Sequence, residues 1–87
     1  MTIDWNDLSF IVRSKYRIEV IKRLNTPKTP TQLAREIGVQ RAHISRALIE
    51  LSKRNLVECL TPEQKMGRLY RRTSKGEEII KYLEYLE

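Results

Sequence analysis

Apolar residues recur every three or four positions in two adjacent segments, 30–37 and 40–54. These apolar positions are Leu33, Ala34 and Ile37 in the first segment and Ile44, Leu48 and Leu51 in the second. The spacing places each set on one side of an α-helix. Gly38 stands between them, where a glycine in the left-handed conformation commonly ends a helix. The pattern therefore predicts a helix-turn-helix in the middle of the chain.

Three further segments carry a helical pattern of apolar residues, namely 4–12, 15–24 and 74–86. Ser14 is a candidate cap for the second of them and the only signal for a break after the first. Thr73 and Ser74 are equally good caps for the third. Upstream of 30–37, Thr29 and Gln32 fit a Thr-x-x-Gln capping box. The chain is therefore predicted to be mainly helical.

Strand-like segments lie between the last two predicted helices. Residues 56–61 and 69–73 have the composition and length of short strands, and a polar loop joins them. This predicts a β-hairpin over 56–72 with an extended tip. The predicted core consists of Ile18, Val20, Ile21, Leu33, Ile37, Ile44, Leu48, Leu51 and Leu56.

The order of the elements predicts one α+β domain over residues 1–87, mainly α with a small β-hairpin. Three short helices would form the core, and the hairpin would pack beside the helix 40–54 as a wing. Additional helices would lie at the two ends of this unit. That arrangement is a winged helix-turn-helix.

The charge composition indicates which kinds of partner such a domain would bind. The chain carries 17 Lys and Arg against 11 Asp and Glu, a net charge of +6. This excess favours a polyanionic partner, with nucleic acid first and an acidic membrane surface second. No apolar run reaches the roughly 18 residues of a membrane span, so we expect no membrane partner. The start of the chain does not resemble a signal peptide, and a single cysteine fits the reducing cytoplasm.

Catalytic and metal-binding groups are scarce. Cys59 and His43 are the only cysteine and the only histidine, too few for a disulfide within the chain or for the ligand cluster of a zinc site. The chain shows no paired-carboxylate, nucleophile–base or phosphate-loop pattern. We therefore expect neither an enzyme nor a metal or cofactor site.

Three blocks of sequence together cover nearly the whole chain. They are RSKYRIEVIKRL (13–24), TPTQLAREIGVQRAHISRALIELSKRNLVE (29–58) and LTPEQKMGRLYRRTSKGEEIIKYL (60–83). They resemble small archaeal winged-helix transcriptional regulators, which are related to the arsenical-resistance-repressor-like and multiple-antibiotic-resistance-regulator-like families. The resemblance implies a domain that binds double-stranded DNA and regulates transcription.

Two positions depart from the pattern of these regulators. Gln40 stands where they usually have Ser or Thr as the cap of the recognition helix, so the cap here is expected to be weaker. Arg72 stands where the second wing strand usually places an apolar residue. An arginine can bury its stem and keep its head in water, so both an inward and an outward orientation stay open.

The candidate DNA contacts lie on the helix 40–54, at the start of the preceding helix and in the wing. They are Gln40, Arg41, Ala42, His43, Ser45 and Arg46, then Lys28 and Thr31, then Lys65 and Arg68. Arginine can read guanine, glutamine can read adenine, and an alanine methyl can meet thymine. We expect the recognition helix to enter the major groove and the wing to touch the backbone or the minor groove.

The C-terminal helix carries a wider apolar stripe than one small core needs, which predicts a homodimer through the terminal helices. The candidate interface residues are Trp5, Leu8, Phe10 and Ile11 at one end and Ile79, Tyr82, Leu83, Tyr85 and Leu86 at the other. The alternative, that these helices complete the core of a single chain, stays open.

The sequence thus predicts a dimeric, sequence-specific, double-stranded-DNA-binding transcription regulator. Two alternatives stay open: a non-specific architectural chromatin protein that uses the same basic face, and a winged helix that binds another protein instead of DNA.

Overall fold

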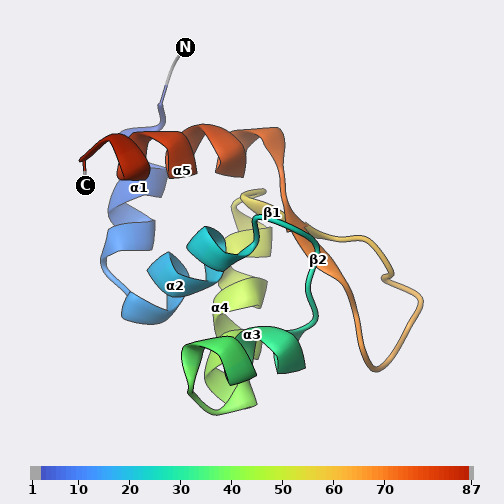
Figure 1. The fold of residues 1–87 in the computed structure, drawn as a ribbon. Coiled ribbons are helices and arrows are strands. Elements are labelled where there is room, and N and C mark those ends of the chain that lie inside the picture. The colour runs from blue at the N-terminus through green and yellow to red at the C-terminus, as the bar shows by residue number, and fades with distance from the viewer. Residues whose placement is uncertain (1–2, 87) are drawn as a thin grey trace.

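The computed structural model describes residues 3–86, and the first two and the last residue of the predicted domain 1–87 lie outside the described residues. The helices and strands are α1 (Trp5–Val12), α2 (Lys15–Arg23), α3 (Pro30–Ile37), α4 (Arg41–Lys53), β1 (Val57–Cys59), β2 (Tyr70–Arg72) and α5 (Ser74–Leu86). In Figure 1, α5 lies along one end of the molecule beside α1, α3 lies at the opposite end, and the loop between the strands projects sideways. The predicted winged helix is confirmed.

Local signals fix the helix-turn-helix. Thr29 Oγ1 accepts a hydrogen bond from the Gln32 amide at 3.1 Å, and Gln32 Oε1 accepts one from the Thr29 amide at 2.8 Å, which completes the predicted capping box. Gly38 ends α3 with a φ of +82°, in the left-handed region that favours glycine. The turn between α3 and α4 is therefore encoded by the residues on either side of it.

Caps also explain where the other helices begin. Asp4 accepts hydrogen bonds from the amides of the first turn of α1, so the helix starts one residue after the start of the predicted range 4–12. Ser14 caps α2 through the Arg17 amide at 3.3 Å and separates it from α1. Thr73 Oγ1, and not Ser74, accepts from the Gly76 amide at the start of α5. Each predicted range for the other helices matches or differs only by a capping residue.

The wing is a two-stranded antiparallel sheet that is tied to the rest of the domain at its base. Val57 pairs with Arg72 and Cys59 with Tyr70, so the hairpin differs from the predicted range 56–72 by one residue, and its strands are shorter than the predicted 56–61 and 69–73. Lys28 and Tyr70 exchange two backbone hydrogen bonds of 3.1 and 2.9 Å, which add an isolated bridge on the far side of β2. This bridge fixes the wing beside the start of α3.

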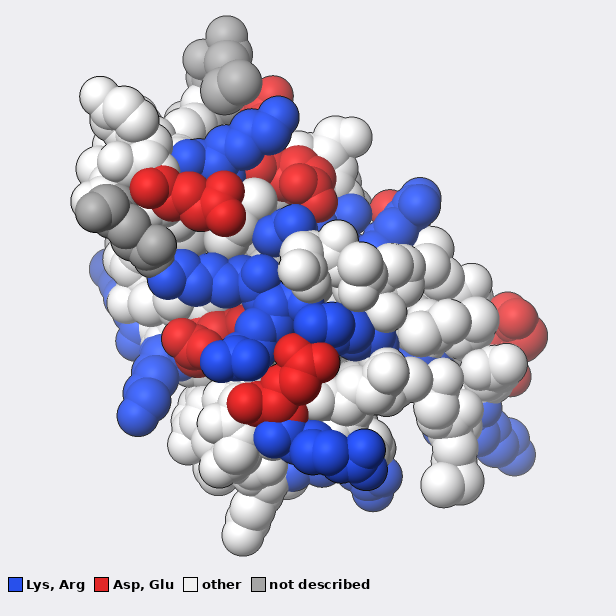
Figure 2. Space-filling view, in the orientation of Figure 1, with Lys and Arg blue, Asp and Glu red and all other residues white. Residues whose placement is uncertain are grey.

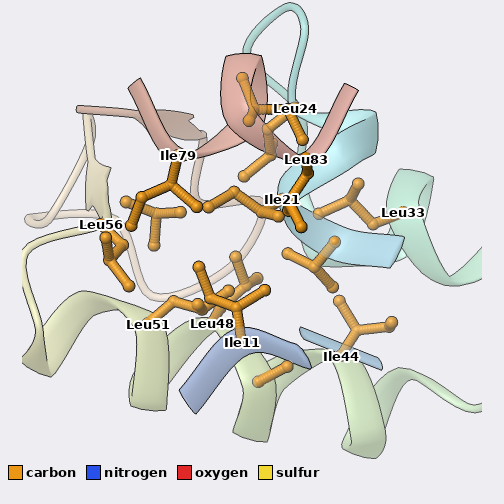
Figure 3. Packing of buried hydrophobic residues seen from close by; sticks show 14 of the residues in the cluster. Ile11, Ile21, Leu24, Leu33, Ile44, Leu48, Leu51, Leu56, Ile79 and Leu83 are labelled. Carbon is orange, nitrogen blue, oxygen red and sulfur yellow. The ribbon is translucent and has the colours of Figure 1, made fainter. Parts of the chain in front are cut away.

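The core is drawn from every helix and from the start of the wing. Its buried hydrophobic residues are Ile11, Val20, Ile21, Leu24, Leu33, Ala34, Ile44, Ala47, Leu48, Leu51, Leu56, Val57, Ile79, Ile80 and Leu83. Ile18 and Ile37, which were predicted as core, are only partly buried. Figure 3 shows Ile79 and Leu83 of α5 pointing into the same cluster as Leu48 of α4.

Three of the residues predicted for the dimer interface therefore need correction. Ile11, Ile79 and Leu83 are buried inside one chain and cannot form a surface. The physical reason is that α2, α3 and α4 alone leave one side of their apolar cluster open, and α1 and α5 close it. Both terminal helices thus complete the core of the domain.

A buried carboxylate holds α1 against α4 and α5. Asp7 is only 3% exposed. The Arg54 guanidinium donates to its Oδ1 at 3.2 Å, and the Lys75 ammonium lies 2.7 Å from its Oδ2. One turn on, the Phe10 ring lies between two guanidinium groups, at 3.8 Å from Arg17 and 4.1 Å from Arg54. Phe10, which was predicted for the dimer interface, is instead covered by these cations.

Arg72 points inward. Its side chain is 9% exposed, and it donates to the Ile21 carbonyl at 3.1 Å and to the Glu77 carboxylate at 2.8 Å. The position that departs from the usual apolar residue therefore joins β2 to α2 and α5 through satisfied polar contacts.

We expect Asp7→Asn to lower the free energy of unfolding by about 1–3 kcal/mol, because charge-assisted contacts at a buried carboxylate are lost. Burial by itself would raise the pKa of Asp7, but Lys75 and Arg54 together hold this pKa below its ordinary value of 3.8. The carboxylate therefore contributes its full stabilisation above pH 3.8 and loses it as the pH falls through the lowered pKa. Urea unfolding from neutral pH downward should show the two proteins converging at acidic pH.

The exposed ion pair between Arg71 and Glu58, with an N–O distance of 3.3 Å, offers a matched control. Arg71→Ala should change the free energy of unfolding by about 0.5 kcal/mol or less. A gap between the native protein and Asp7→Asn that stays constant down to low pH would contradict the prediction.

Candidate nucleic-acid interface

The outward face of α4 is divided into two flanks by its helical periodicity. Arg41 and Ser45, four residues apart, lie on the flank beside the wing. His43 and Arg46 lie on the other flank, beside α2. Ala42 is exposed between the flanks, and its small side chain leaves the helix backbone close to whatever surface approaches it.

The wing-side groove is a depression of about 360 Å³ between α3, α4 and the wing. It is lined by Pro30, Thr31, Arg41, Ser45, Lys65, Met66, Gly67, Arg68 and Tyr70. The cations Arg41, Lys65 and Arg68 therefore face the same groove as the hydroxyl groups of Thr31 and Ser45. Gly67 has a φ of +66° and turns the tip of the loop, and Arg68 is held there by a hydrogen bond to the Gln64 carbonyl. The groove combines the donors that bind phosphate oxygens.

The α2-side groove lies on the opposite flank and has a volume of about 210 Å³. It is lined by Ser14, Tyr16, Arg17, His43, Arg46, Ala47 and Glu50. The rings of Tyr16 and His43 are stacked, with 4.6 Å between centroids and 9° between planes. Glu50 is the only acidic residue of this groove, and the Arg17 guanidinium donates to it at 3.1 Å.

Ion pairs are distributed unevenly between this face and the rest of the molecule. Within residues 3–86, Arg41, Arg46, Lys65 and Arg68 form no ion pair. Arg17 pairs with Glu50 in the α2-side groove, and other paired cations lie elsewhere: Arg23 with Glu19 and Glu36, Arg71 with Glu58, and Arg72 with Glu77. Figure 2 shows one face of the molecule, on which acidic and basic side chains lie next to one another. Unpaired cations thus gather around α4 and the wing tip, while Arg13, Arg35 and Lys81 also form no ion pair among residues 3–86.

The structure brings most of the predicted DNA contacts together on one surface. Gln40, Arg41, Ala42, His43 and Arg46 are exposed on the first turns of α4, and Ser45 is half-buried beside them. Thr31, Lys65 and Arg68 meet Arg41 in the wing-side groove. All of these residues belong to one continuous face.

Lys28 does not belong to that face. Its ammonium donates to the Glu36 carboxylate at 2.9 Å, and its side chain is only 16% exposed. The local sequence gave no sign of this pair, because Glu36 follows eight residues later on the next helix. Tyr16 was missed for a similar reason, since only the packing of α2 against α4 places it beside His43 and Arg46.

The remaining dimer candidates form an apolar patch on the terminal helices. Trp5 is 62% exposed, Tyr85 84% and Leu86 59%. Tyr82 is half-buried, and its ring meets Trp5 edge-to-face with 5.4 Å between centroids. Leu8 is half-buried and packs against the core. We call Trp5, Tyr82, Tyr85 and Leu86 the terminal patch.

Metal and membrane signals are both lacking in the part of the chain that the structure describes. Residues 3–86 bring together no group of three His, Cys, Asp or Glu side chains that could hold a metal ion. Within the same range no helix combines the length and apolar character needed to cross a bilayer. Cys59 is a free, half-buried thiol on β1.

Comparison with known proteins relates the chain to transcription regulators. A family described as the HVO_A0261 N-terminal domain matches residues 5–87. The crystal structure of the MarR family transcription regulator SP03579 is 25% identical, with a TM-score of 0.74 over 93% of this chain. ZitR from Lactococcus lactis, 14% identical, has the same fold, with a TM-score of 0.60 over 94% of this chain. The match spans 60% and 66% of these two chains. No curated protein matches the sequence.

The N-cap of α4 yields a testable consequence. Gln40 occupies the N-cap of α4 with a φ of −70° and a ψ of 143°, yet its side chain makes no capping hydrogen bond. We expect Gln40→Ser to raise the free energy of unfolding by about 0.5–1 kcal/mol, because a serine hydroxyl can accept from a free amide of the first turn. Gln40→Ala, which cannot accept, should bring no gain. Urea unfolding of the three proteins tests this, and equal stabilities would refute the weak cap.

Proposed function

The chain belongs to the HVO_A0261 N-terminal domain family, and from this premise we propose that it binds double-stranded DNA and regulates transcription. One observation carries the proposal. Arg41, Lys65 and Arg68 line a single groove beside α4 without any ion pair among the described residues, whereas most acidic side chains neutralise cations elsewhere. A surface of this kind suits the phosphates of a duplex.

The name of one structural neighbour supports the same function. SP03579 is described as a MarR family transcription regulator, and its identity of 25% extends over 93% of this chain. The TM-score of 0.74 shows that its fold is similar to the fold of this chain. The proposed partner is therefore DNA and not another protein.

In the proposed complex, the first turns of α4 enter the major groove. Arg41 and Arg46 would donate to guanine, Gln40 would pair with adenine, and Ala42 would contact a thymine methyl. Lys65 and Arg68 would contact phosphates or the adjacent minor groove from the wing. Thr31, at the start of α3, would donate its hydroxyl proton to a backbone oxygen.

We expect Arg41→Ala and Arg46→Ala each to weaken binding to the preferred sequence by about 1–3 kcal/mol, because each removes a bidentate donor to a base edge. Fragments selected from genomic DNA supply that sequence, and fluorescence anisotropy at fixed salt measures the affinity. Both side chains are exposed, so the fold should be unaffected. Lys81→Ala on α5 is a charge-matched control, since Lys81 is exposed and lies outside both grooves.

Random duplex of the same length separates the alternatives. A regulator should bind its selected sequence about a thousandfold or more tighter than random duplex. Equal affinity for both would favour an architectural chromatin protein. Unchanged affinity in both arginine variants would contradict the proposed face and favour a protein-binding module.

We also propose that two chains bind DNA as a homodimer through the terminal patch. Trp5, Tyr85 and Leu86 expose large apolar surfaces close to one another on α1 and α5, which a monomer has no reason to keep in water. A two-fold arrangement would set the two recognition helices about 34 Å apart, one turn of the duplex.

Analytical ultracentrifugation at micromolar concentration tests the dimer. The native protein should sediment with twice the mass of one chain, and Tyr85→Glu combined with Leu86→Glu should sediment as a single chain. Met66→Glu is the matched control, because Met66 is an exposed apolar residue on the wing and outside the patch. A native protein that stays monomeric, free and on DNA, would refute this proposal and leave the DNA-binding proposal standing.

A further inference from the structure

We infer that the α2-side groove is a second binding site for the DNA backbone, on the wall of the major groove opposite the wing, with Lys15 and His43 as its phosphate contacts. This inference rests on the proposed function and extends it. His43 and Arg46 were already candidate DNA contacts from the sequence, whereas Lys15, Tyr16 and the grouping of these residues beside α2 were not predicted.

The charge of the α2-side groove supports a phosphate ligand. Its one carboxylate, Glu50, is neutralised by Arg17 at 3.1 Å. Arg17 is further occupied by the Phe10 carbonyl at 2.8 Å and by the Phe10 ring. Arg46 is exposed and carries no ion pair among residues 3–86. The groove therefore presents a net positive charge that no protein group neutralises.

Lys15 adds a further cation at the rim of this groove. It stands between Ser14 and Tyr16, both of which line the groove, and it is exposed. Within the described part of the chain it forms no ion pair or hydrogen bond through its side chain. It can therefore reach a phosphate without giving up an existing contact.

The width of the DNA major groove explains why the α2-side groove would meet a second stretch of the DNA backbone. The major groove is about 12 Å wide and an α-helix with its side chains is about 10–12 Å across, so both flanks of an inserted helix come against phosphates. The wing lies on the flank of Arg41 and Ser45. His43 and Arg46 occupy the opposite flank. A duplex held by the wing on one side therefore meets the α2-side groove on the other.

The stack of Tyr16 on His43 orders the His43 side chain for its contact with a phosphate. The parallel rings, 4.6 Å apart, fix the His43 side chain before any ligand binds. A side chain that is already ordered avoids part of the entropy cost of binding, about 0.5–1.5 kcal/mol for one immobilised group. The imidazole N–H can then donate to a phosphate oxygen. Tyr16 is in this view a positioning residue and His43 the contact.

The salt dependence of duplex binding tests whether Lys15 contacts a phosphate. Lys15→Ala should weaken binding to selected and random duplex alike, and should lower the slope of log affinity against log salt by about 1, because one phosphate contact is lost. Lys81→Ala should leave affinity and slope unchanged. An unchanged slope in Lys15→Ala, together with weaker binding in Arg41→Ala, would overturn this inference and leave the proposed function intact.

A double-mutant cycle tests the stack. Tyr16→Leu should weaken duplex binding about two- to tenfold, whereas Tyr16→Phe, which keeps the ring, should bind like the native protein. In a His43→Ala background, Tyr16→Leu should have no further effect, because the side chain it positions is gone. Circular dichroism confirms that each variant is folded.

Equal losses from Tyr16→Leu in both backgrounds would show that Tyr16 acts only on the fold and would overturn its positioning role. Unchanged binding in every variant, Arg41→Ala included, would refute the proposed function itself.

Discussion

The structure depends on the burial of one face of α4. Ile44, Leu48 and Leu51 pack into the cluster formed by α2, α3 and α5, and this packing sets the rotation of α4 about its own axis. Because a helix has 3.6 residues per turn, fixing the buried face also fixes which side chains point outward. Over the first turns of α4 the outward set is basic and polar, with the small Ala42 at its centre, and Ile49 is exposed farther along the helix. The same apolar contacts that stabilise the domain therefore also orient its basic surface.

Ion pairs outside the core also affect where unpaired positive charge lies on the surface. Carboxylates on α2, α3, α5 and β1 pair with arginine and lysine side chains of the same or neighbouring elements, namely Glu19, Glu36, Glu77 and Glu58. Around α4 the only carboxylate of the two grooves, Glu50, is already paired. Several unpaired cations of the described residues thus lie on or beside the helix-turn-helix, and Arg13 and Lys81 are unpaired outside it. Two separate properties of the sequence, hydrophobic period and charge, converge on one face.

The features that were predictable from the sequence are those with local causes. The capping box of Thr29 and Gln32, the left-handed Gly38 and the hydrophobic period of α4 each involve residues within a few positions of one another. The features that were missed join distant segments. Arg72 reaches the Ile21 carbonyl, 51 residues away, and Lys28 meets Glu36 on the next helix. The terminal helices belonged to this second class, because an apolar stripe looks the same whether it faces its own core or a second chain.

The buried Asp7 bears on the smallest chain that can fold as this domain does. It lies between Arg54, which follows the last turn of the recognition helix, and Lys75, in the first turn of α5. Without α1, these two cations would stand beside each other over an uncovered apolar surface that Ile11 now fills. A chain that lacked α1 would lose both the carboxylate that pairs with Arg54 and Lys75 and the side chain of Ile11 that fills the adjacent core. The first helix is therefore an integral part of the folding unit, although it lies far along the sequence from the wing.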